Sequence, residues 1–576
     1  MKILGFYDGH NAAAALIEDG KVIFAIEEER LSRIKFHDGR KFEHGLPYRC
    51  IGETLRNTGT KPEEIDMIAL GFESTKDSLH RTLHDYQKIE RNRMIPFTLG
   101  WPIPIVYQEY RLFNVLRVLR KYNLHNTKLV RINHHIAHAA SAYYNGNKKN
   151  ATVITLDGKG DGLAGLVMVV ENGEFKILSE ISFYDSPGHF YSTVTEGLGF
   201  RHNRHEGKIT GLAAYGHWDN EAYKAFKNIL NTENLNFEYS LSRKIPQLPY
   251  PLIAPFKKYW QVMKSEINNF SELSREHIAS AAQKRLEDSV TSFVRTCVDK
   301  SGFPDVVTAG GVFANVKLNQ KVTEMEEVDS FFVYPAMGDG GIAVGAALYC
   351  YGMEMLSKGN IFQPCEIDPP YYGPKYSSEE IEQSLKNHRL KYRYVEDIEL
   401  EVAHMIRDKK VVGRFDGRLE YGPRALGNRS ILVTPVDNSI NDSLNKRMKR
   451  TEFMPFAPVT LEEEASATYI NYAKGSYPAR FMTITFDVEK EIRKKIPAVV
   501  HIDNTARPQT INKKQNRSYY ETLKIFKDIT GLNSFINTSF NMHEEPIVCT
   551  PDDAIKSFKT KCVDVLAIGN YIVENI

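Results

Sequence analysis

A pattern that occurs twice most constrains how this chain can fold. Each copy is an apolar strand followed by an Asp-Gly turn, and then two further apolar strands joined by a turn with Gly after Asp or Asn. Glycine accepts the positive φ that tight hairpin turns demand, so each copy predicts a β-hairpin behind a leading strand. The copies cover residues 3–26 and 152–181. The recurrence predicts a duplicated α/β lobe, with unrelated hairpins of an ordinary α/β protein as the alternative.

The rest of the chain divides by composition. At 576 residues, the chain exceeds what one hydrophobic core usually organises. Residues 74–122 are charged, aromatic-rich and helical in pattern, which indicates an insertion, and prolines without a regular period mark 356–374 as a linker. We therefore expect an N-terminal domain at 1–355 and an α/β C-terminal domain at 375–576. Within them the pattern predicts helices at 275–300 and 398–408 and strands at 305–308, 411–415, 481–486 and 566–573.

Charge and cysteine content narrow the cellular setting. The 74 Lys and Arg residues nearly balance the 72 Asp and Glu residues, so we expect neither a nucleic-acid partner nor an anionic membrane surface. The six cysteines form no CxxC pair, and the apolar run at the N-terminus is too short for a signal peptide. These features predict a cytoplasmic protein, and they are compatible with an oligomer.

Two histidines share one face of a predicted helix. His134 and His138 are four residues apart in an Ala-rich run, so their side chains project in the same direction. Two imidazoles make half of a transition-metal site, which carboxylates from elsewhere would complete. The alternative is a pair of histidines that pack or cap the helix.

Three Gly-rich segments follow at intervals along the chain. Residues 157–162 form a Gly-rich turn with Asp157 and Asp161, residues 309–315 contain Gly310, Gly311 and Asn315, and residues 335–341 contain Asp339. Glycines let backbone N–H groups approach a phosphate, and an acidic residue can hold the accompanying metal. Each segment alone is weak evidence. Their order is the one expected of an ATP-binding core of the actin and sugar-kinase type.

A fifth segment is rich in arginine. Residues 417–430 combine Arg418, Arg424 and Arg429 with four glycines or prolines nearby. Planar guanidinium groups match phosphate oxygens, so this segment predicts an anion site, with a solvated basic loop as the alternative.

These residues resemble those of the O-carbamoyltransferases, a family that includes tobramycin and nodulation-type enzymes. The resemblance runs nearly end to end. Its markers are Glu27-Glu28-Glu29-Arg30 with Lys35, and the runs His134–Ala142, Gly207–Gly216, Gly422–Gly427, Pro455–Pro458 and Asn537–Asn541. The resemblance implies a TsaD-like N-terminal domain joined to a YrdC-like C-terminal domain.

The same resemblance implies an activity in two stages. Carbamoyl phosphate and ATP would give carbamoyl adenylate in the C-terminal domain. The N-terminal domain would then transfer the carbamoyl group to a hydroxyl of a small-molecule acceptor. ATP, Mg²⁺ and an iron-type divalent metal are the implied cofactors. A tRNA-modifying enzyme that forms threonylcarbamoyl adenosine and a non-catalytic nucleotide-binding protein are the alternatives.

Matching to the family motifs implies a role for each candidate residue. His134, His138, Asp157 and Asp339 would hold the metal, and His10 would serve the acceptor as general base or orienting group. The nucleotide would contact Lys35, Gly207, Lys208, Gly310 and Asn315, with Asp161 and Gly311 as further candidates. Carbamoyl phosphate would contact Arg424, Asn537 and Ser539, with Arg418 beside them.

The chain departs from the family pattern at one position. Met454 stands where the family often has an arginine before Pro-Phe-Ala-Pro. Either Arg450 or Lys449 replaces that arginine, or the first-stage substrate or its affinity differs from the family's. The acceptor is not encoded in a motif. The insertion at 74–122, with Trp101 and Tyr107, is expected to shape the acceptor side, unless these aromatic residues only pack the insertion.

Overall fold

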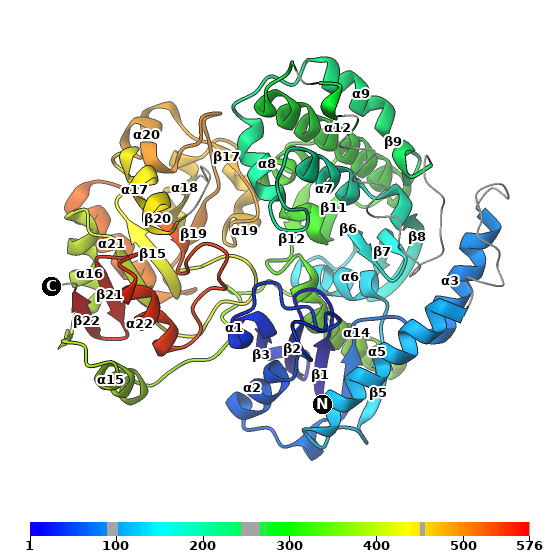
Figure 1. Ribbon diagram of the computed structural model, residues 1–576, viewed down its shortest axis with the longest axis horizontal. Helices are drawn as coiled ribbons and strands as arrows, with labels where there is room; N and C mark the ends of the chain where they lie inside the picture. Colours follow the sequence, from blue (N-terminus) through cyan, green and yellow to red (C-terminus); the bar gives the residue numbers. More distant parts are fainter. Residues whose placement is uncertain (89–101, 244–264, 266, 271, 450–455, 575–576) are drawn as a thin grey trace. The chain divides into compact units, whose positions relative to one another are not determined.

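The computed structural model describes residues 1–88, 102–243, 265, 267–270, 272–449 and 456–574 (Figure 1). The chain forms two compact units. The first contains Met1–Ile23 and His37–Glu366, and the second contains Phe24–Phe36 and Ile367–Ile576. The second unit therefore takes a short segment from the N-terminal part of the chain. The domain limits given above, 1–355 and 375–576 with a linker at 356–374, stay a prediction.

Two five-stranded sheets of one topology form the centre of the first unit. In each sheet the leading strand pairs antiparallel with the strand that follows it and parallel with a later strand, which pairs parallel with the last. The first sheet has the order β3-β2-β1-β4-β5 and the second β8-β7-β6-β11-β12. The shared order confirms the duplicated α/β lobe.

The ten strands have these bounds: β1 (Lys2–Tyr7), β2 (Ala13–Glu18), β3 (Lys21–Glu27), β4 (Met67–Leu70), β5 (Lys128–Arg131), β6 (Ala151–Gly160), β7 (Leu163–Glu171), β8 (Glu174–Ser182), β11 (Asp305–Ala309) and β12 (Ser330–Val333). The helices of the unit are α2 (Arg49–Thr58), α3 (Thr75–Lys88), α5 (Pro102–Arg120), α6 (His134–Asn145), α7 (Pro187–Gly197), α8 (Glu206–Ala213), α9 (Glu221–Ile229), α10 (Ser240–Arg243), α12 (Arg275–Ser301), α13 (Val316–Thr323) and α14 (Ile342–Ser357). A small ribbon joins β9 (Leu230–Glu233) to β10 (Asn236–Tyr239). The predicted helix at 275–300 and strand at 305–308 are confirmed, and α3 and α5 lie side by side in the expected helical insertion (Figure 1).

The hairpin turns have the backbone geometry that their residues predict. Asp19-Gly20, Asp161-Gly162 and Asn172-Gly173 all have positive φ at both positions, which is the type I′ arrangement that matches the twist of the strands. The Gly-rich turn predicted at 157–162 is wrong in extent. Strand β6 continues to Gly160 through an irregular register after Leu156, and only the last two residues turn. Such an irregularity redirects side chains at the end of a strand.

Helices α6 and α14 pack unusually closely because small residues meet between them. A Cβ atom on Gly345 of α14 would lie 1.8 Å from the carbonyl oxygen of Ala137 on α6. On the other side of α14, a Cβ atom on Gly5 of β1 would lie 1.9 Å from the carbonyl oxygen of Ala343. Helix α14 therefore lies directly between strand β1 and helix α6.

The second unit is built on one mixed eight-stranded sheet with the order β13-β22-β21-β14-β15-β20-β16-β19. Neighbouring residues of a strand face opposite cores: in β15, Ile431 packs with α15 and α22, and Leu432 packs with α16 and α21. The strands are β13 (Arg393–Tyr394), β14 (Val412–Phe415), β15 (Arg429–Val433), β16 (Ala457–Leu461), β19 (Gln509–Ile511), β20 (Ser534–Ser539), β21 (Val565–Ile568) and β22 (Tyr571–Glu574). The helices are α1 (Glu28–Ser32), α15 (Ser378–Asn387), α16 (Ile398–Arg407), α17 (Ser439–Arg447), α18 (Glu462–Thr468), α19 (Ser476–Ala479), α20 (Lys490–Lys495), α21 (Arg517–Thr530) and α22 (Pro551–Lys559).

The expected α/β architecture of the C-terminal region is confirmed, with two elements wrong. The single strand predicted at 566–573 is a hairpin, in which β21 and β22 pair antiparallel and Gly569, with a φ of +53°, lies in the turn between them. The strand predicted at 481–486 is reduced to Phe486–Asp487 of β17, which pairs with β18 (Thr505–Ala506). Met482 has a left-handed φ of 57°, and the hydroxyl of Thr483 donates to the carbonyl of Pro478. These residues turn the chain before it can extend.

Two arginines connect the N-terminal segment of this unit to its C-terminal part. Arg30 of α1 donates to the carbonyl of Gly422 at 2.8 Å, and Arg33 donates to the carbonyls of Pro546 and Ile547 at 2.7 and 2.8 Å. Buried Glu27 and Glu29 hold the Arg30 guanidinium at 2.7 and 2.8 Å. The segment is therefore an integral part of the second unit.

Gly345→Ala tests the contact between α6 and α14. The added methyl group would meet a backbone carbonyl, which cannot move like a side chain, so we expect the free energy of unfolding to fall by about 1–3 kcal/mol. Denaturant titration measures this change. Gly207→Ala is the control, because no atom lies within 4 Å of its Cβ position, and its stability should stay the same or rise slightly. Equal stability of Gly345→Ala and the wild type would show that the helices separate without cost.

Candidate active site

Four side chains from three parts of the first unit meet in one buried place. His134 and His138 come from α6, Asp157 from the end of β6, and Asp339 from the turn before α14. One donor atom from each lies within 4.8 Å of all the others. Nε2 of His138 is 3.4 Å from Asp157 Oδ2 and 3.8 Å from Asp339 Oδ1, and Nε2 of His134 is 3.6 and 3.7 Å from the same two oxygens. The structure thus brings together the four residues that the resemblance implies.

The facing atoms of this donor set fit a metal ion better than hydrogen bonds. Their separations exceed normal hydrogen-bond lengths, and within the described chain His134 Nε2, His138 Nε2 and Asp157 Oδ2 have no hydrogen-bond partner. Two ligands about 2.1 Å from a tetrahedral ion lie about 3.4 Å apart, which is close to the observed spacing. Two imidazoles and two carboxylates suit a first-row divalent ion.

Electrostatics couple the four side chains. Both histidines are at most 3% exposed. Although burial opposes the imidazolium, the two carboxylates raise the pKa of His138 to about 9. Against the effect of burial, the two histidines hold the pKa of Asp157 well below its ordinary value. The two carboxylates therefore stabilise a positive charge between them, which either an imidazolium or a metal cation can supply.

Other polar groups hold the donors in place. Asn133 caps α6 by accepting from the N–H groups of His135 and Ile136 at 2.9 and 3.3 Å. Asp161, expected at the nucleotide, is 2% exposed, and its Oδ2 accepts from the backbone N–H groups of His134 and Glu73, both at 2.8 Å. Asp161 thus secures the start of α6.

Buried Glu73 borders this helix start. Its Oε2 lies 3.3 Å from Nε of Arg81, which also pairs with Glu180. Burial and the nearby Asp161 carboxylate outweigh Arg81 and raise the pKa of Glu73 to about 8. The side chain is therefore mostly protonated at neutral pH.

The glycines expected at the nucleotide lie beside Asp157. Gly310 has a φ of +106°, and a Cβ atom there would lie 2.1 Å from the carbonyl oxygen of Leu156, so only glycine fits. A Cβ atom on Gly311 would lie 3.0 Å from Asp157 Oδ1. Bare backbone therefore borders the donor set, as approach of a phosphate requires.

The remaining nucleotide candidates are more scattered. Asn315 caps α13 and exchanges two hydrogen bonds with Gln283 of α12, at 2.8 and 3.2 Å. Gly207 and Lys208 lie in the first turn of α8, where Gly207 is exposed. Lys35 belongs to the second unit.

The acceptor candidate His10 lies in the turn after β1. It is half-buried and lies close to Asp38. Burial raises the pKa of Asp38, but Arg40, which donates to it at 2.8 and 2.9 Å, lowers it to about 2. In the same turn, buried Asp8 pairs with Arg111 of α5. Of the aromatic residues expected at the acceptor, Tyr107 lies on α5, and Trp101 lies outside the described residues.

The Arg-rich segment of the second unit is organised by a residue that sequence reasoning missed. Oε1 of buried Glu420 accepts from the backbone N–H groups of Leu426, Asn428 and Arg429 at 2.9, 2.7 and 3.1 Å. A carboxylate that binds three N–H groups fixes the shape of a loop. No spacing of residues signals this interaction, because backbone donors leave no pattern in a sequence.

The three arginines of the segment have different environments. Arg418 donates to the carbonyls of Tyr372 and Gly373, and Arg429 donates to the carbonyls of Pro374, Asp416, Gly417 and Asn428. Arg424 is half-buried and has no hydrogen bond or ion pair within the described chain. Burial lowers the pKa of Arg424 to about 10. Arg424 is therefore the guanidinium that is available to an anion.

Asn537 on β20 lies beside the same loop. Its amide donates to the carbonyl of Ala425 at 3.1 Å and to Gln509 at 2.7 Å, and its Oδ1 is buried without a partner in the described chain. Ser539, two residues further, projects from the same face of the strand and donates to Asn541. Gln509, which also donates to the carbonyl of Leu426, was not predicted. Arg450 and Met454 lie outside the described residues.

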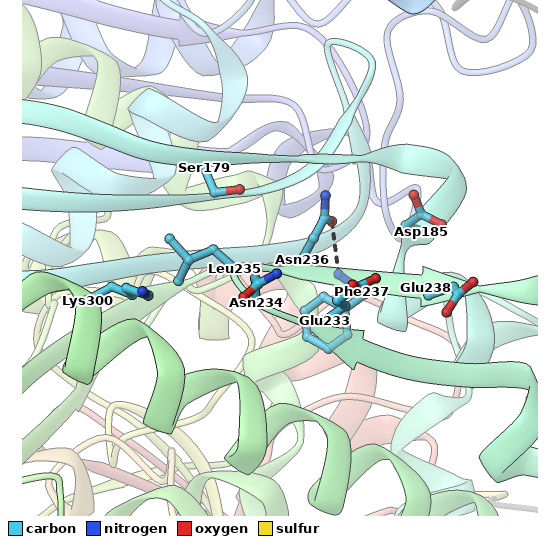
Figure 2. A pocket seen from close by; sticks show the side chains of 9 residues that line it. All are labelled: Ser179, Asp185, Glu233, Asn234, Leu235, Asn236, Phe237, Glu238 and Lys300. Atoms are coloured by element: carbon cyan, nitrogen blue, oxygen red, sulfur yellow. Dashed lines mark hydrogen bonds between the residues drawn. The ribbon is translucent and has the colours of Figure 1, made fainter. Parts of the chain in front are cut away.

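A separate groove lies beside the β9–β10 ribbon (Figure 2). Its volume is about 560 Å³, and polar side chains such as Ser179, Asp185, Glu233 and Lys300 line it. None of the four donors or the predicted site residues takes part, so the groove is not part of the candidate active site.

The fold and the donor set define a duplicated α/β protein with a candidate metal centre, joined to a second α/β unit. That unit offers an arginine, Arg424, that has no partner among the described residues. The sequence matches the profiles described as Carbamoyltransferase N-terminus over residues 2–348 and Carbamoyltransferase C-terminus over residues 403–575. The chain therefore belongs to the carbamoyltransferase family.

Relatives match over almost the whole length. An uncharacterized protein of Methanocaldococcus jannaschii is 34% identical over 100% of this chain and 99% of its own. Nodulation protein NolNO of Sinorhizobium fredii is 31% identical over 98% of this chain and 79% of its own. The solved HypF of T. kodakarensis aligns with 61% of this chain and 47% of its own at 16% identity and a TM-score of 0.32, so the fold assignment relies on the strand order. No described helix is both long and apolar enough to cross a membrane.

His138→Ala tests the donor set. We expect the wild type to hold one divalent ion per chain, and His138→Ala, which lacks one of the two imidazoles, to hold none. Elemental analysis after dialysis against Co²⁺ or Fe²⁺ measures the metal content. His135→Ala is the matched control on the same helix, because the ring nitrogens of His135 face Thr155 and the carbonyl of Leu163 instead. Equal metal content in wild type and His138→Ala would assign the histidines a structural role only.

Glu73→Gln tests the buried carboxyl group. Because its pKa is about 8 when folded and 4.5 when unfolded, the folded chain holds the extra proton between these values. Protonated Glu73 contributes its full stabilisation of the folded state below pH 4.5, and this contribution is lost as the pH rises through 8. Glutamine does not ionise, so the unfolding free energy of the variant relative to wild type should rise by up to about 1.4 kcal/mol per pH unit over this range. Denaturant titrations at about pH 5 and 8 measure it, with Glu180→Gln as control. A constant difference would contradict the prediction.

Proposed function

We propose that the protein is an ATP-dependent O-carbamoyltransferase that activates a carbamoyl group in its second unit and transfers it in its first. The observation that carries this proposal is the set of two buried histidines and two half-buried aspartates in a member of the carbamoyltransferase family. Within the described chain, three of its four facing atoms lack a hydrogen-bond partner. Buried polar atoms without partners are costly, so a cation that pairs with all of them stabilises the set.

The first stage uses the Arg-rich loop. Carbamoyl phosphate and water give carbamate and phosphate, and an oxygen of carbamate attacks the α-phosphorus of ATP to give carbamoyl adenylate and pyrophosphate. The free guanidinium of Arg424 binds the phosphate of carbamoyl phosphate, while Asn537 and Ser539 bind the carbamoyl group. Arg418 contributes by holding the loop through two backbone carbonyls, and Arg450 adds a second cation.

The second stage uses the first unit. An acceptor hydroxyl attacks the carbonyl carbon of carbamoyl adenylate, AMP leaves, and His10 takes the hydroxyl proton. Gly207, Lys208, Gly310, Gly311 and Asn315 line the nucleotide. His134, His138, Asp157 and Asp339 would hold an iron-type divalent ion, which would supply a Lewis acid for the carbonyl group and positive charge for the leaving phosphate. Mg²⁺ accompanies ATP, and the acceptor is a small molecule with a hydroxyl group.

The two alternatives differ in their products. A tRNA-modifying enzyme would yield threonylcarbamoyl adenosine, and a non-catalytic protein would bind ATP without releasing pyrophosphate. Pyrophosphate release separates either enzyme from a non-catalytic protein, and mass spectrometry of the product, a carbamoylated hydroxyl compound or threonylcarbamoyl adenosine, separates the two enzymes. Carbamoyl phosphate-dependent release of pyrophosphate is the result that supports the proposed first stage.

Arg424→Gln tests this first stage. Loss of a charge-assisted contact of about 1.5–3 kcal/mol should raise the KM for carbamoyl phosphate roughly 10-fold or more. Pyrophosphate release measures the change. Exposed Arg407, which pairs with Asp408, provides the matched control Arg407→Gln. Unchanged kinetics in Arg424→Gln would place the carbamoyl phosphate site elsewhere.

A further inference from the structure

A hydroxyl group that no sequence pattern singles out lies against one of the four donors. Tyr7, the last residue of β1, is 2% exposed, and its OH donates to Asp339 Oδ2 at 2.8 Å. The other oxygen, Oδ1, faces Nε2 of His134 and His138 at 3.7 and 3.8 Å. Tyr7 therefore occupies one carboxylate oxygen and leaves the other to the donor set.

The two carboxylate oxygens of Asp157 likewise have different neighbours, and a backbone N–H group binds one of them. The N–H of Gly158 donates to Asp157 Oδ1 at 2.6 Å, and Oδ2 faces the two histidines. Carboxylates bind metal ions through one oxygen or through both. Each aspartate here offers one oxygen, so the number of ligand atoms depends on Gly158 and Tyr7.

The aromatic ring of Tyr7 lies beside a side chain of the insertion at 74–122. The Arg111 guanidinium lies 5.5 Å from the centre of the Tyr7 ring and 4.0 Å from that of Phe72. The same guanidinium forms two hydrogen bonds to Asp8, the residue after Tyr7, and both charged groups are buried. A buried ion pair and contact with two aromatic faces restrict the end of β1. Helix α5 thus reaches the metal centre through Arg111.

We propose that Tyr7 is a positioning residue of the metal centre, which keeps Asp339 bound through one oxygen, and that Arg111 keeps Tyr7 in place. The proposal rests on the metal site of the proposed function. Partners of metal ligands typically change metal affinity 10–100-fold when removed. The ring of Tyr7 contacts Arg111, whereas only its hydroxyl contacts Asp339, so the two contributions are separable.

Tyr7→Phe removes the hydroxyl and keeps the ring. We expect this variant to bind Co²⁺ 10–100-fold more weakly than the wild type in competition with a chromophoric chelator. Its visible d–d absorption should also decrease, because a carboxylate that binds through both oxygens raises the coordination number. Tyr143→Phe is the matched control, since this buried tyrosine of α6 donates to the carbonyl of Lys149 instead, and it should match the wild type in both measurements.

A second variant tests the contribution of the insertion. Arg111→Lys keeps a cation beside Asp8 and removes the planar group from Tyr7, so we expect several-fold weaker Co²⁺ binding. If Tyr7→Phe has the Co²⁺ affinity and the absorption spectrum of the wild type, the proposal is overturned. If only Arg111→Lys binds Co²⁺ like the wild type, the role of Arg111 is overturned. If the wild type binds no Co²⁺, or binds it as tightly as His138→Ala does, the metal site of the proposed function is wrong and this role of Tyr7 with it.

Discussion

Close contact between helices α6 and α14 sets the positions of three of the four donors in the candidate metal centre, His134, His138 and Asp339. Gly345 lets α14 approach the backbone of α6, and Gly5 lets β1 approach α14 from the other side. As a result, the two histidines of α6, the carboxylate before α14 and the hydroxyl at the end of β1 come within reach of one another. Interiors packed this densely transmit small displacements, so a shift of either helix would move ligands that belong to separate elements.

The two copies of the lobe each have an aspartate near the end of the leading strand, and the two aspartates have different environments. The pair Asp8-Gly9 directly follows β1, and the pair Asp157-Gly158 lies within the last residues of β6. Asp8 is neutralised by Arg111, whereas Asp157 faces two imidazoles. The local environment, rather than the residue type, therefore decides which aspartate can serve a metal ion.

Much of the fold could be predicted, because hairpins and long helices leave local patterns. Asp19-Gly20 and Asn172-Gly173 require positive φ, and α12 shows a regular apolar spacing. The strand predicted at 481–486 is wrong. Its apolar residues favour a strand, but they do not show that Met482 adopts a left-handed conformation.

The site was predictable only in part. The spacing of His134 and His138 places them on one helical face, and composition identified the Arg-rich segment. Composition could not show that Arg418 and Arg429 are bound to backbone carbonyls and that Arg424 is not. The hydrogen bond from Tyr7 to Asp339 joins residues 332 positions apart, and tertiary structure alone brings such residues together.

Membership of Phe24–Phe36 in the second unit has a consequence for biosynthesis. This segment leaves the ribosome early, but the carbonyls that Arg30 and Arg33 bind belong to Gly422, Pro546 and Ile547. Domains usually complete their folding in the order of synthesis. Here Glu27, Glu28, Glu29 and Arg30 are all at most 5% exposed in the folded protein, so water must solvate their charges until residues up to Ile547 have been synthesised. The second unit therefore cannot complete its folding before that point of translation.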